Sequence, residues 1–284
     1  MLNYLRSYLD HRGPYPAKIR ARHQEFWNDP NAEHVRNTLM DAEHPIDEWT
    51  NVKNWQRRLS NKHNAREFAG KFGCKVAGLF WEGRDVEKIN FAGLPKNYVI
   101  RPTIGHSSNY VFIMKDGYNL FDKKHYQPAE ILAILKQQVA ANKHVYFLIE
   151  EFLQNEQGAT EILKDYKIFC FNGEIACIWV IDRLSPTTGA ACFYDENWNM
   201  IKQVNKKYKL SSYQNPPACL KDMLNQAKIL SKAYKIFVRI DFYATNNGAV
   251  FGEFTPTPSM GGNTTKFGQK LLMSYWDKYC PNLI

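Results

Sequence analysis

Residues 237–262, FVRIDFYATNNGAVFGEFTPTPSMGG, constrain the fold of this chain more than any other stretch. Apolar and polar residues alternate over 237–243 and again over 249–254, as they do in strands with two different faces. The segment Asn246-Asn247-Gly248 between them has the composition of a tight turn. The stretch therefore predicts a β-hairpin.

Polar side chains on this hairpin are spaced for one common site. Side chains two apart on a strand face the same way, so Arg239 and Asp241 share a face, and Glu253 and Thr255 share one on the return strand. If these faces coincide, two carboxylates lie together and need a positive partner, for which a hard divalent cation such as Mg²⁺ is suitable. The same spacing also describes an amphipathic hairpin with a solvated acidic face.

The composition narrows the class of protein. With 284 residues, 44% of them hydrophobic, the chain can bury a sizeable core. Its net charge of +9 favours an anionic partner, which leaves nucleotides, acidic polysaccharides, membrane surfaces and nucleic acids open. Because no nucleic-acid-binding motif is evident, we expect no nucleic-acid partner. Without a run of about 20 apolar residues or a signal-peptide core, we expect no membrane insertion and a cytoplasmic location.

The six cysteines are scattered, without a CxxC pair or a nearby histidine. This spacing predicts buried free thiols rather than a zinc site.

Helical and strand-like segments follow one another along the chain. Residues 1–60 are predicted to be helical, with Trp27, Trp49 and Trp55 as packing anchors. The remaining predicted segments are a helix at 65–72, strands at 76–81, 98–102 and 110–114, a helix at 128–141, a strand at 145–153, a hairpin at 165–182 turning at Asn172-Gly173, and a helix from Pro216 to about Tyr234. We expect the resulting units to pack as one body with a cleft between them.

A polar loop at 105–109, GHSSN, lies between two of these strands. Backbone amides and hydroxyls in such a loop can donate to phosphate oxygens, which makes Gly105, Ser107 and Ser108 candidates for phosphate binding. Arg101, on the preceding strand, would add a guanidinium with bidentate geometry. Ordinary hairpins and surface strands use the same residue types.

Other charged residues lie at the ends of elements. Lys62 precedes a helix, and Glu150 and Glu151 end the apolar strand VYFLIEEFL, where a carboxylate can accept from a ribose hydroxyl. Lys167 lies on the hairpin that follows, and Arg183 comes directly after its last residue. Each of these positions also suits a solvated surface charge.

Taken in order, these parts resemble the ATP-grasp superfamily, and most closely its TupA-like branch, which is associated with teichuronopeptide and other surface-polysaccharide synthesis. The runs that carry the resemblance are NKHNAREFAGKFG, LPKNYVIRPTIGHSSN, IEEFL, DYKIFCFNGEI, FYDENWN and VRIDFYATNNGAVFGEFTPTPSMGG. The resemblance implies an α+β ATP-grasp fold in which two α+β subdomains grip ATP. Residues 1–60 would form a helical N-terminal segment, 61–150 the small subdomain with the Gly/Ser phosphate loop, and 151–284 the large subdomain with the metal-binding hairpin.

The resemblance also implies roles for the residues that match the family's motifs. Lys62 and Arg101 would contact the phosphates of ATP, although Arg101 stands where the family usually has a lysine. Gly105, Ser107 and Ser108 would close over the triphosphate.

The hinge and the basic residues of the second half match the family as well. Glu150, Glu151 and Leu153 match the segment that holds adenine and ribose, Leu153 through its backbone. Lys167 and Arg239 match basic residues that face the phosphates or the substrate carboxylate, and they are the candidate catalytic residues.

The metal and acceptor sites follow from the same comparison. Asp241 and Glu253 match the carboxylates that bind Mg²⁺. Thr255 departs from the asparagine that many relatives have, although a threonine hydroxyl can still coordinate Mg²⁺ or hold a metal-bound water. Arg183 and His106 are candidates for holding the acceptor substrate.

The chemistry that the resemblance implies is that of an ADP-forming carboxylate-amine ligase, which makes an amide through an acylphosphate. From the resemblance, our leading interpretation is attachment of an amino acid or small amine to a uronic acid of a bacterial surface polysaccharide or capsule, and the net charge of +9 is compatible with an acidic substrate. A peptide ligase acting on a small peptide or natural product is one alternative. A nucleotide-binding module without turnover is another, motivated by the departures at Arg101 and Thr255.

Overall fold

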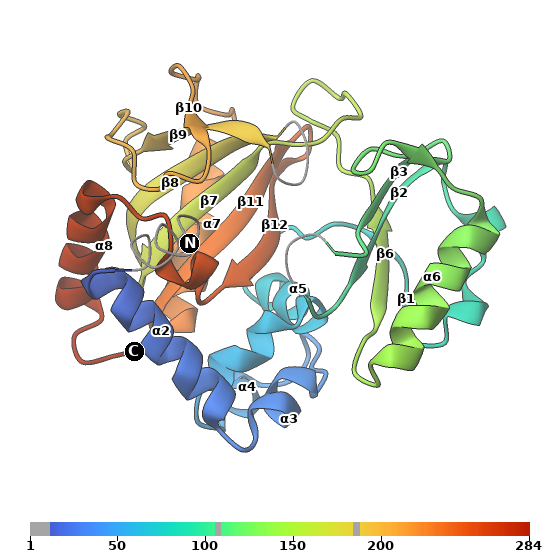
Figure 1. Ribbon diagram of the computed structural model, residues 1–284, viewed down its shortest axis with the longest axis horizontal. Coiled ribbons are helices and arrows are strands. Elements are labelled where there is room, and N and C mark those ends of the chain that lie inside the picture. The colour runs from blue at the N-terminus through green and yellow to red at the C-terminus, as the bar shows by residue number, and fades with distance from the viewer. Residues whose placement is uncertain (1–11, 106–108, 184–187) are drawn as a thin grey trace, which may run out of the picture.

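Two six-stranded β-sheets lie side by side in the computed structural model, which describes residues 12–105, 109–183 and 188–284 (Figure 1). Helices cover the outer face of the smaller sheet and both faces of the larger one. This mixture of helices and mostly antiparallel strands confirms the predicted α+β class.

The N-terminal part is helical over its described residues, as predicted. It contains α2 (Pro14–Asn28), α3 (Ala32–Asn37), α4 (Ile46–Thr50) and the 3-10 helix η1 (Trp55–Ser60). Proline begins α2, where a backbone N–H would have no helical partner. The buried side chains Tyr15, Ile19, Arg22 and Phe26 recur at helical spacing and form its inner face.

The three tryptophans of this part differ in burial. Trp49 and Trp55 lie in the core beside Phe68, as expected of packing anchors. The expectation is wrong for Trp27, which is 45% exposed. Phe26 takes the inward position on α2, so the next side chain points outward, where the guanidinium of Arg57 lies 3.8 Å from the Trp27 ring centroid.

The smaller sheet has the order β1-β6-β2-β3-β4-β5 and is antiparallel throughout. Its strands are β1 (Leu79–Gly83), β2 (Asn97–Pro102), β3 (Phe112–Lys115), β4 (Tyr118–Asn119), β5 (Lys124–His125) and β6 (Phe147–Glu151). Two 3-10 turns, η2 (Val86–Lys88) and η3 (Phe91–Gly93), join β1 to β2. Helix α6 (Pro128–Ala141) has the predicted bounds, and its Ile131 and Leu135 cover one face of the sheet.

The larger sheet has the order β10-β9-β8-β7-β11-β12, and only the β10–β9 pair is parallel. Its strands are β7 (Asp165–Phe171), β8 (Glu174–Arg183), β9 (Gly189–Tyr194), β10 (Lys209–Leu210), β11 (Phe237–Thr245) and β12 (Gly248–Thr255). The β7–β8 hairpin turns at Asn172 and Gly173, both with left-handed φ, as its sequence predicts.

One face of the larger sheet is covered by α7 (Leu220–Tyr234) and α5 (Lys62–Lys71), and the other by α2 and α8 (Lys266–Tyr279). Under α2 and α8 this second face is aromatic, with Phe169 of β7 and Phe237 of β11. Further along the same strands, the positions on this face are Lys167 and Asp241. A single face is therefore apolar at one end and charged at the other.

Helix α5 lies between the two sheets (Figure 1). Its residues Ala65, Phe68 and Ala69 belong to the core of the larger sheet, whereas the backbone N–H of Lys62 donates to Thr103 O, just after β2, at 2.7 Å. The domain boundaries at 60 and 150 stay predictions.

All six cysteines are free thiols, and five of them are buried, as expected. Cys219 is the partly exposed one.

Candidate active site on the faces of the two sheets

The β11–β12 hairpin brings its four predicted polar side chains to one face. Arg239 pairs with Thr255 across the two strands, and Asp241 pairs with Glu253. Directly opposite residues of an antiparallel pair point to the same side, so the two predicted faces coincide.

A β-bulge makes this coincidence possible. Phe242 pairs with Phe251 but Asp241 pairs with Glu253, so Gly252 is an extra residue in β12. Without the bulge, Glu253 would lie opposite the residue before Asp241 and point into the core under α7. A Cβ at position 252 would lie 3.0 Å from Asp241 O, so glycine suits this close approach.

The oxygen atoms of the three predicted metal ligands converge on one nitrogen. Nη2 of Arg239 lies 2.7 Å from Asp241 Oδ2, 2.8 Å from Thr255 Oγ1 and 3.3 Å from Glu253 Oε1. Among the described residues there is no group of three or more His, Cys, Asp and Glu side chains that could hold a metal. Mg²⁺ commonly uses only one or two carboxylates and completes its shell with phosphate oxygens and water, so two carboxylates and a hydroxyl fit that ion.

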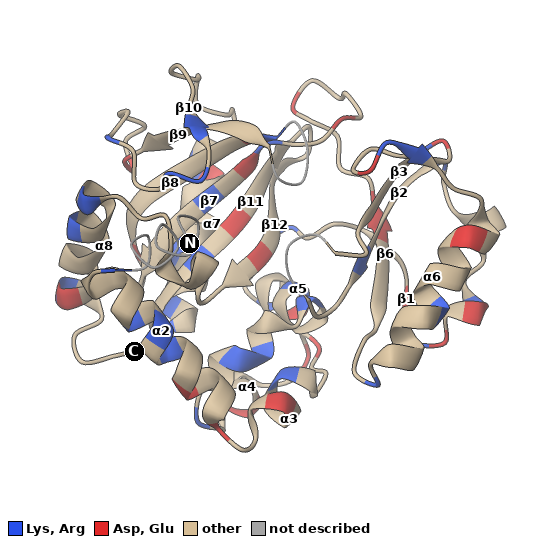
Figure 2. Ribbon diagram, in the orientation of Figure 1, with Lys and Arg blue, Asp and Glu red and all other residues tan. Residues whose placement is uncertain are grey.

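Ion pairs extend from this point across two more strands. Lys167 on β7 contacts Asp241 directly and lies 3.7 Å from Asp165 Oδ1, and Asp165 accepts from Arg183 on β8. The result is a row of alternating charges on β8, β7, β11 and β12, and Figure 2 shows acidic bands on β11 and β12 beside the charged bands of β7.

The buried charges in this row stabilise one another. Burial by itself would raise the pKa of Asp241, but Arg239 and Lys167 lower it below its usual range. Burial likewise opposes the charge on Arg239, and the carboxylates of Asp241 and Glu253 outweigh it and raise the pKa of Arg239. Asp241 is therefore an ionised, buried carboxylate whose two oxygens are both held by cations.

The smaller sheet contributes a second charged group from β6. Glu150 is 3% exposed, and its Oε1 accepts from Arg66 at 2.6 Å and from Arg101 at 3.0 Å. Arg101 also reaches the bulge, since its Nη1 lies 3.4 Å from Gly252 O on the larger sheet. The two sheets thus meet where Arg101 lies over the β11–β12 hairpin.

Lys62 lies at the start of α5 beside this junction. Burial lowers the pKa of its ammonium, the carboxylate of Glu253 works in the opposite direction, and Arg101 lowers it further. Unlike Arg101, Lys62 has no ion-pair partner among the described side chains. Lys62 therefore adds an ammonium group beside Glu253 and Arg101.

Three of the remaining predicted residues, Glu151, Leu153 and Gly105, make no hydrogen bond or ion pair with this group in the described part of the chain. Oε1 of Glu151 accepts from the backbone N–H of Gly78 at 2.7 Å, Leu153 is half-buried just after β6, and Gly105 is exposed with a left-handed φ of 132°. The predicted residues His106, Ser107 and Ser108 lie outside the described residues.

Two charged residues that the sequence analysis missed belong to this site. Arg66 shares a face of α5 with Lys62, four positions earlier, but the predicted helix began only at residue 65 and so did not link the two. Lys207 lies on an exposed segment. Partial burial is the largest cause that lowers its pKa, and the positive charges of Arg183 and Lys167 are the next largest. Its only sequence signal is the basic run KKYK.

Comparison with known proteins decides the family. A family model described as TupA-like ATPgrasp matches residues 51–272, which is most of the chain. The chain belongs to the TupA-like ATP-grasp family. The match starts within the N-terminal part, so α2, α3 and α4 precede the region that defines the family.

Solved structures confirm the ATP-grasp fold of this family member. A D-alanine–D-alanine ligase from Bacillus anthracis is similar with a TM-score of 0.51 and 16% identity, over 78% of this chain and 67% of the ligase. The D-alanine–D-alanine ligase from Helicobacter pylori has a TM-score of 0.50 and 17% identity, over 80% of this chain and 61% of the ligase. The TupA-like chain thus spans about two thirds of these ligases or less. Comparison with curated proteins found no match.

The described helices of this TupA-like chain include none that is both long and apolar enough to span a membrane.

Proposed function

We propose that this TupA-like ATP-grasp chain is an ATP-dependent, ADP-forming ligase that joins a carboxylate to an amine. The observation that carries this proposal is the convergence of Asp241, Glu253 and Thr255 on one cationic nitrogen of Arg239, opposite the basic pair Lys62 and Arg101. Two carboxylates and a hydroxyl among basic side chains suit a magnesium ion that is shared with nucleotide phosphates.

In this proposal Asp241, Glu253 and Thr255 would hold Mg²⁺, which when bound withdraws charge from the phosphate oxygens of ATP. Lys62 and Arg101 would bind the phosphates from the side of the smaller sheet. Gly105, Ser107 and Ser108 would cover the phosphates, and Glu150, Glu151 and Leu153 would hold adenine and ribose.

The reaction has two steps that balance without a covalent protein intermediate. An oxygen of the substrate carboxylate attacks the γ-phosphorus of ATP, the bond to the bridging oxygen breaks, and ADP leaves. The amine then attacks the carbonyl carbon of the acylphosphate, phosphate leaves, and the amine nitrogen loses a proton to solvent. Arg239 and Lys167, positioned by Asp241, would stabilise the charge that develops on the transferred group.

The charges around the acceptor end support an acidic substrate. Arg183 and Lys207 add positive charge beside Lys167 and Arg239, whereas Asp165 is already shared by two cations. We propose that Arg183, together with the undescribed His106, holds a carboxylate substrate, and that a uronic acid of a bacterial surface polysaccharide is that substrate. The amine would be an amino acid or another small amine.

The decisive experiment measures ADP release with ATP, Mg²⁺, an amino acid and either a uronic acid or a second amino acid. We expect release with the uronic acid, and loss of release in Asp241→Asn and Glu253→Gln. Asp182→Asn is the matched control, because Asp182 is exposed on the opposite face of β8 from Arg183.

Each outcome separates the candidate functions. Release that requires two amino acids would favour a peptide ligase. ATP binding without ADP release for any acceptor pair would favour a nucleotide-binding module. Full turnover in both carboxylate variants would refute the metal site.

The acceptor role of Arg183 has its own test. In Arg183→Gln we expect KM for the acid to rise at least tenfold, as about 1.4 kcal/mol of lost binding implies, with KM for ATP unchanged. An equal rise in KM for both substrates would contradict an acceptor role.

A further inference from the structure

Helix α2 precedes the region that defines the family, yet it contacts the β11–β12 hairpin through a buried arginine. Arg22 is fully buried, and its Nη1 donates to Phe237 O at 2.5 Å and to Pro256 O at 3.3 Å. Phe237 is the first residue of β11, and Pro256 follows the last residue of β12. One guanidinium therefore ties together the two strands that hold the candidate site.

This tie lies at the open end of the hairpin. The last ladder pair before it is Arg239 with Thr255, two of the residues that converge on the candidate metal site. A ladder that ends inside the protein leaves backbone carbonyl groups to be satisfied. Arg22 satisfies one on each strand, two positions before Arg239 and one after Thr255.

Aromatic rings hold Arg22 in place. Its guanidinium carbon lies 4.9 Å from the Trp276 ring centroid and 5.4 Å from that of Phe237, distances at which a cation is attracted to the ring face. Arg22 Nε and Nη2 have no hydrogen-bond partner within the described part of the chain. Because a buried guanidinium with free N–H groups is costly, its two carbonyl contacts and the rings have to offset that cost.

The start of α2 packs closely against the turn that follows the hairpin. In η4 (Pro258–Gly261), a Cβ on Gly261 would lie 2.5 Å from Pro16 Cα on α2. Ser259 and Met260 in the same turn have left-handed φ angles of 48° and 52°. Non-glycine residues hold such angles only where the surroundings impose them.

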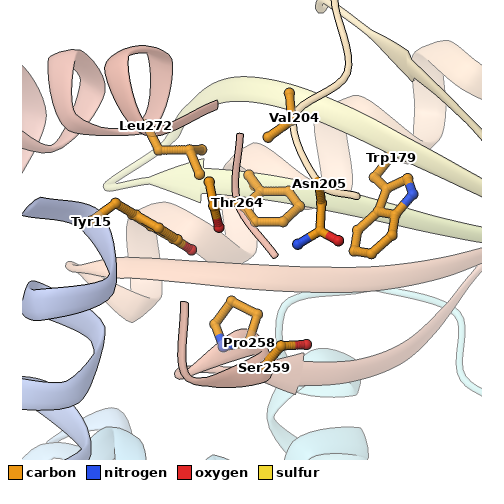
Figure 3. A pocket seen from close by; sticks show the side chains of 9 residues that line it. Tyr15, Trp179, Val204, Asn205, Pro258, Ser259, Thr264 and Leu272 are labelled. Atoms are coloured by element: carbon orange, nitrogen blue, oxygen red, sulfur yellow. The ribbon is translucent and has the colours of Figure 1, made fainter. Parts of the chain in front are cut away.

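Figure 3 shows that α2 also forms a wall of a small pocket beside this turn. Tyr15 faces Thr264 and Pro258 across a cavity of about 10 Å³, which has room for roughly one water molecule. The hydroxyl of Tyr15 is buried and has no partner among the described residues. The pocket is too small for a substrate, so it marks close packing of α2 against the turn.

We propose that α2 supports the active site through Arg22. Arg22 is a positioning residue that holds the open end of the β11–β12 hairpin and so positions Arg239 and Thr255. This proposal rests on the proposed magnesium site. It assigns α2 a role in metal and nucleotide binding, although the helix lies outside the family match.

The test compares Arg22→Lys with Arg57→Lys. Arg57 is a matched control because it is also a buried arginine of the N-terminal part. Its Nε and Nη2 likewise have no partner among the residues that the structure describes, and its guanidinium rests on Trp27. Both variants keep their charge, and urea unfolding establishes that each is folded under the conditions used.

Two measurements decide the proposal. Mn²⁺ binding in the presence of ATP, followed by electron paramagnetic resonance, should weaken about tenfold in Arg22→Lys, as is typical when the support of a metal ligand is lost. Hydrogen exchange of the ligand-free protein should become faster in peptides covering 237–241 and 252–256, and stay unchanged in peptides covering β7. Arg57→Lys should alter neither readout.

Unchanged Mn²⁺ affinity in folded Arg22→Lys would overturn the proposal, and so would unchanged exchange at the hairpin. If the wild-type protein with ATP bound no Mn²⁺, the proposed function would fail instead. Hydrogen exchange, which needs no ligand, would then still decide whether Arg22 ties the strands.

Discussion

Replacing Glu150 by glutamine separates a role in stability from a role in nucleotide binding. The carboxylate is buried between Arg66 and Arg101, and the substitution removes its charge while keeping one acceptor oxygen. Breaking a buried ion pair by neutralising one partner costs about 3–5 kcal/mol. We take the lower end, about 3 kcal/mol, because Arg66 keeps a bond to Ala77 O at 3.0 Å and glutamine still accepts one bond.

The assay is equilibrium unfolding in urea together with a thermal scan. A loss of about 3 kcal/mol corresponds to a fall in Tm of about 6–12 °C for a domain of this size class. Glu151→Gln is the control, since Glu151 is half-buried, accepts from Gly78 N–H and forms no ion pair with a described arginine, so its loss should be about 1 kcal/mol or less.

The reasoning about Glu150 would be refuted if both variants were equally stable. A rise in KM for ATP in Glu150→Gln without a loss of stability would instead indicate that the carboxylate acts on the nucleotide, as the resemblance implies.

Three further predictions concern pH and packing. Burial opposes the charged form of His63, but the carboxylate of Glu82 at 2.8 Å outweighs burial and raises the pKa of His63. This ion pair should therefore stabilise the protein below about pH 6.5 and lose its effect as the pH rises through the pKa of folded His63. An NMR titration of His63 in the wild type and in Glu82→Gln checks this. Asp241, whose pKa is lowered, should stabilise the folded protein above about pH 4 and lose that contribution as the pH falls through its folded pKa. The stability of Asp241→Asn should therefore lack this pH-dependent contribution in acid unfolding. Gly261→Ala should destabilise the protein by more than about 2 kcal/mol, because φ at this position is 75° and an added Cβ would lie too close to Pro16 Cα. Gly70 lies in open space on α5, so Gly70→Ala should stabilise the protein by up to about 1 kcal/mol. Urea unfolding measures both changes.

Local patterns in the sequence determined much of this protein. Strand alternation and turn residues predicted the β7–β8 and β11–β12 hairpins of the larger sheet, and the bounds of α6 were predicted to the residue. The pairing of Arg239 with Asp241 on one face also followed from spacing, because strand periodicity is a property of the local backbone. The family resemblance added the fold, which the family match and the solved structures confirm.

Tertiary structure alone decided how the polar groups meet. The bulge at Gly252 turns Glu253 to the face of Asp241, and no periodicity in the sequence reports an inserted residue. Arg101, Arg66 and Glu150 are separated in the chain by up to 84 positions and meet only because α5 lies between the sheets.

The N-terminal segment shows the same limit. Its helices were predicted from periodicity, but the burial of Arg22 against the carbonyls of Phe237 and Pro256, more than 200 positions away, depends on how α2 packs on the larger sheet. From sequence alone, a charged side chain in a polar helix is predicted to lie on the surface. Spacing along the helix indicates the direction in which a side chain points, but not which residues lie in that direction. Local backbone periodicity therefore determines which hairpin residues share a face, and tertiary packing determines what that face meets.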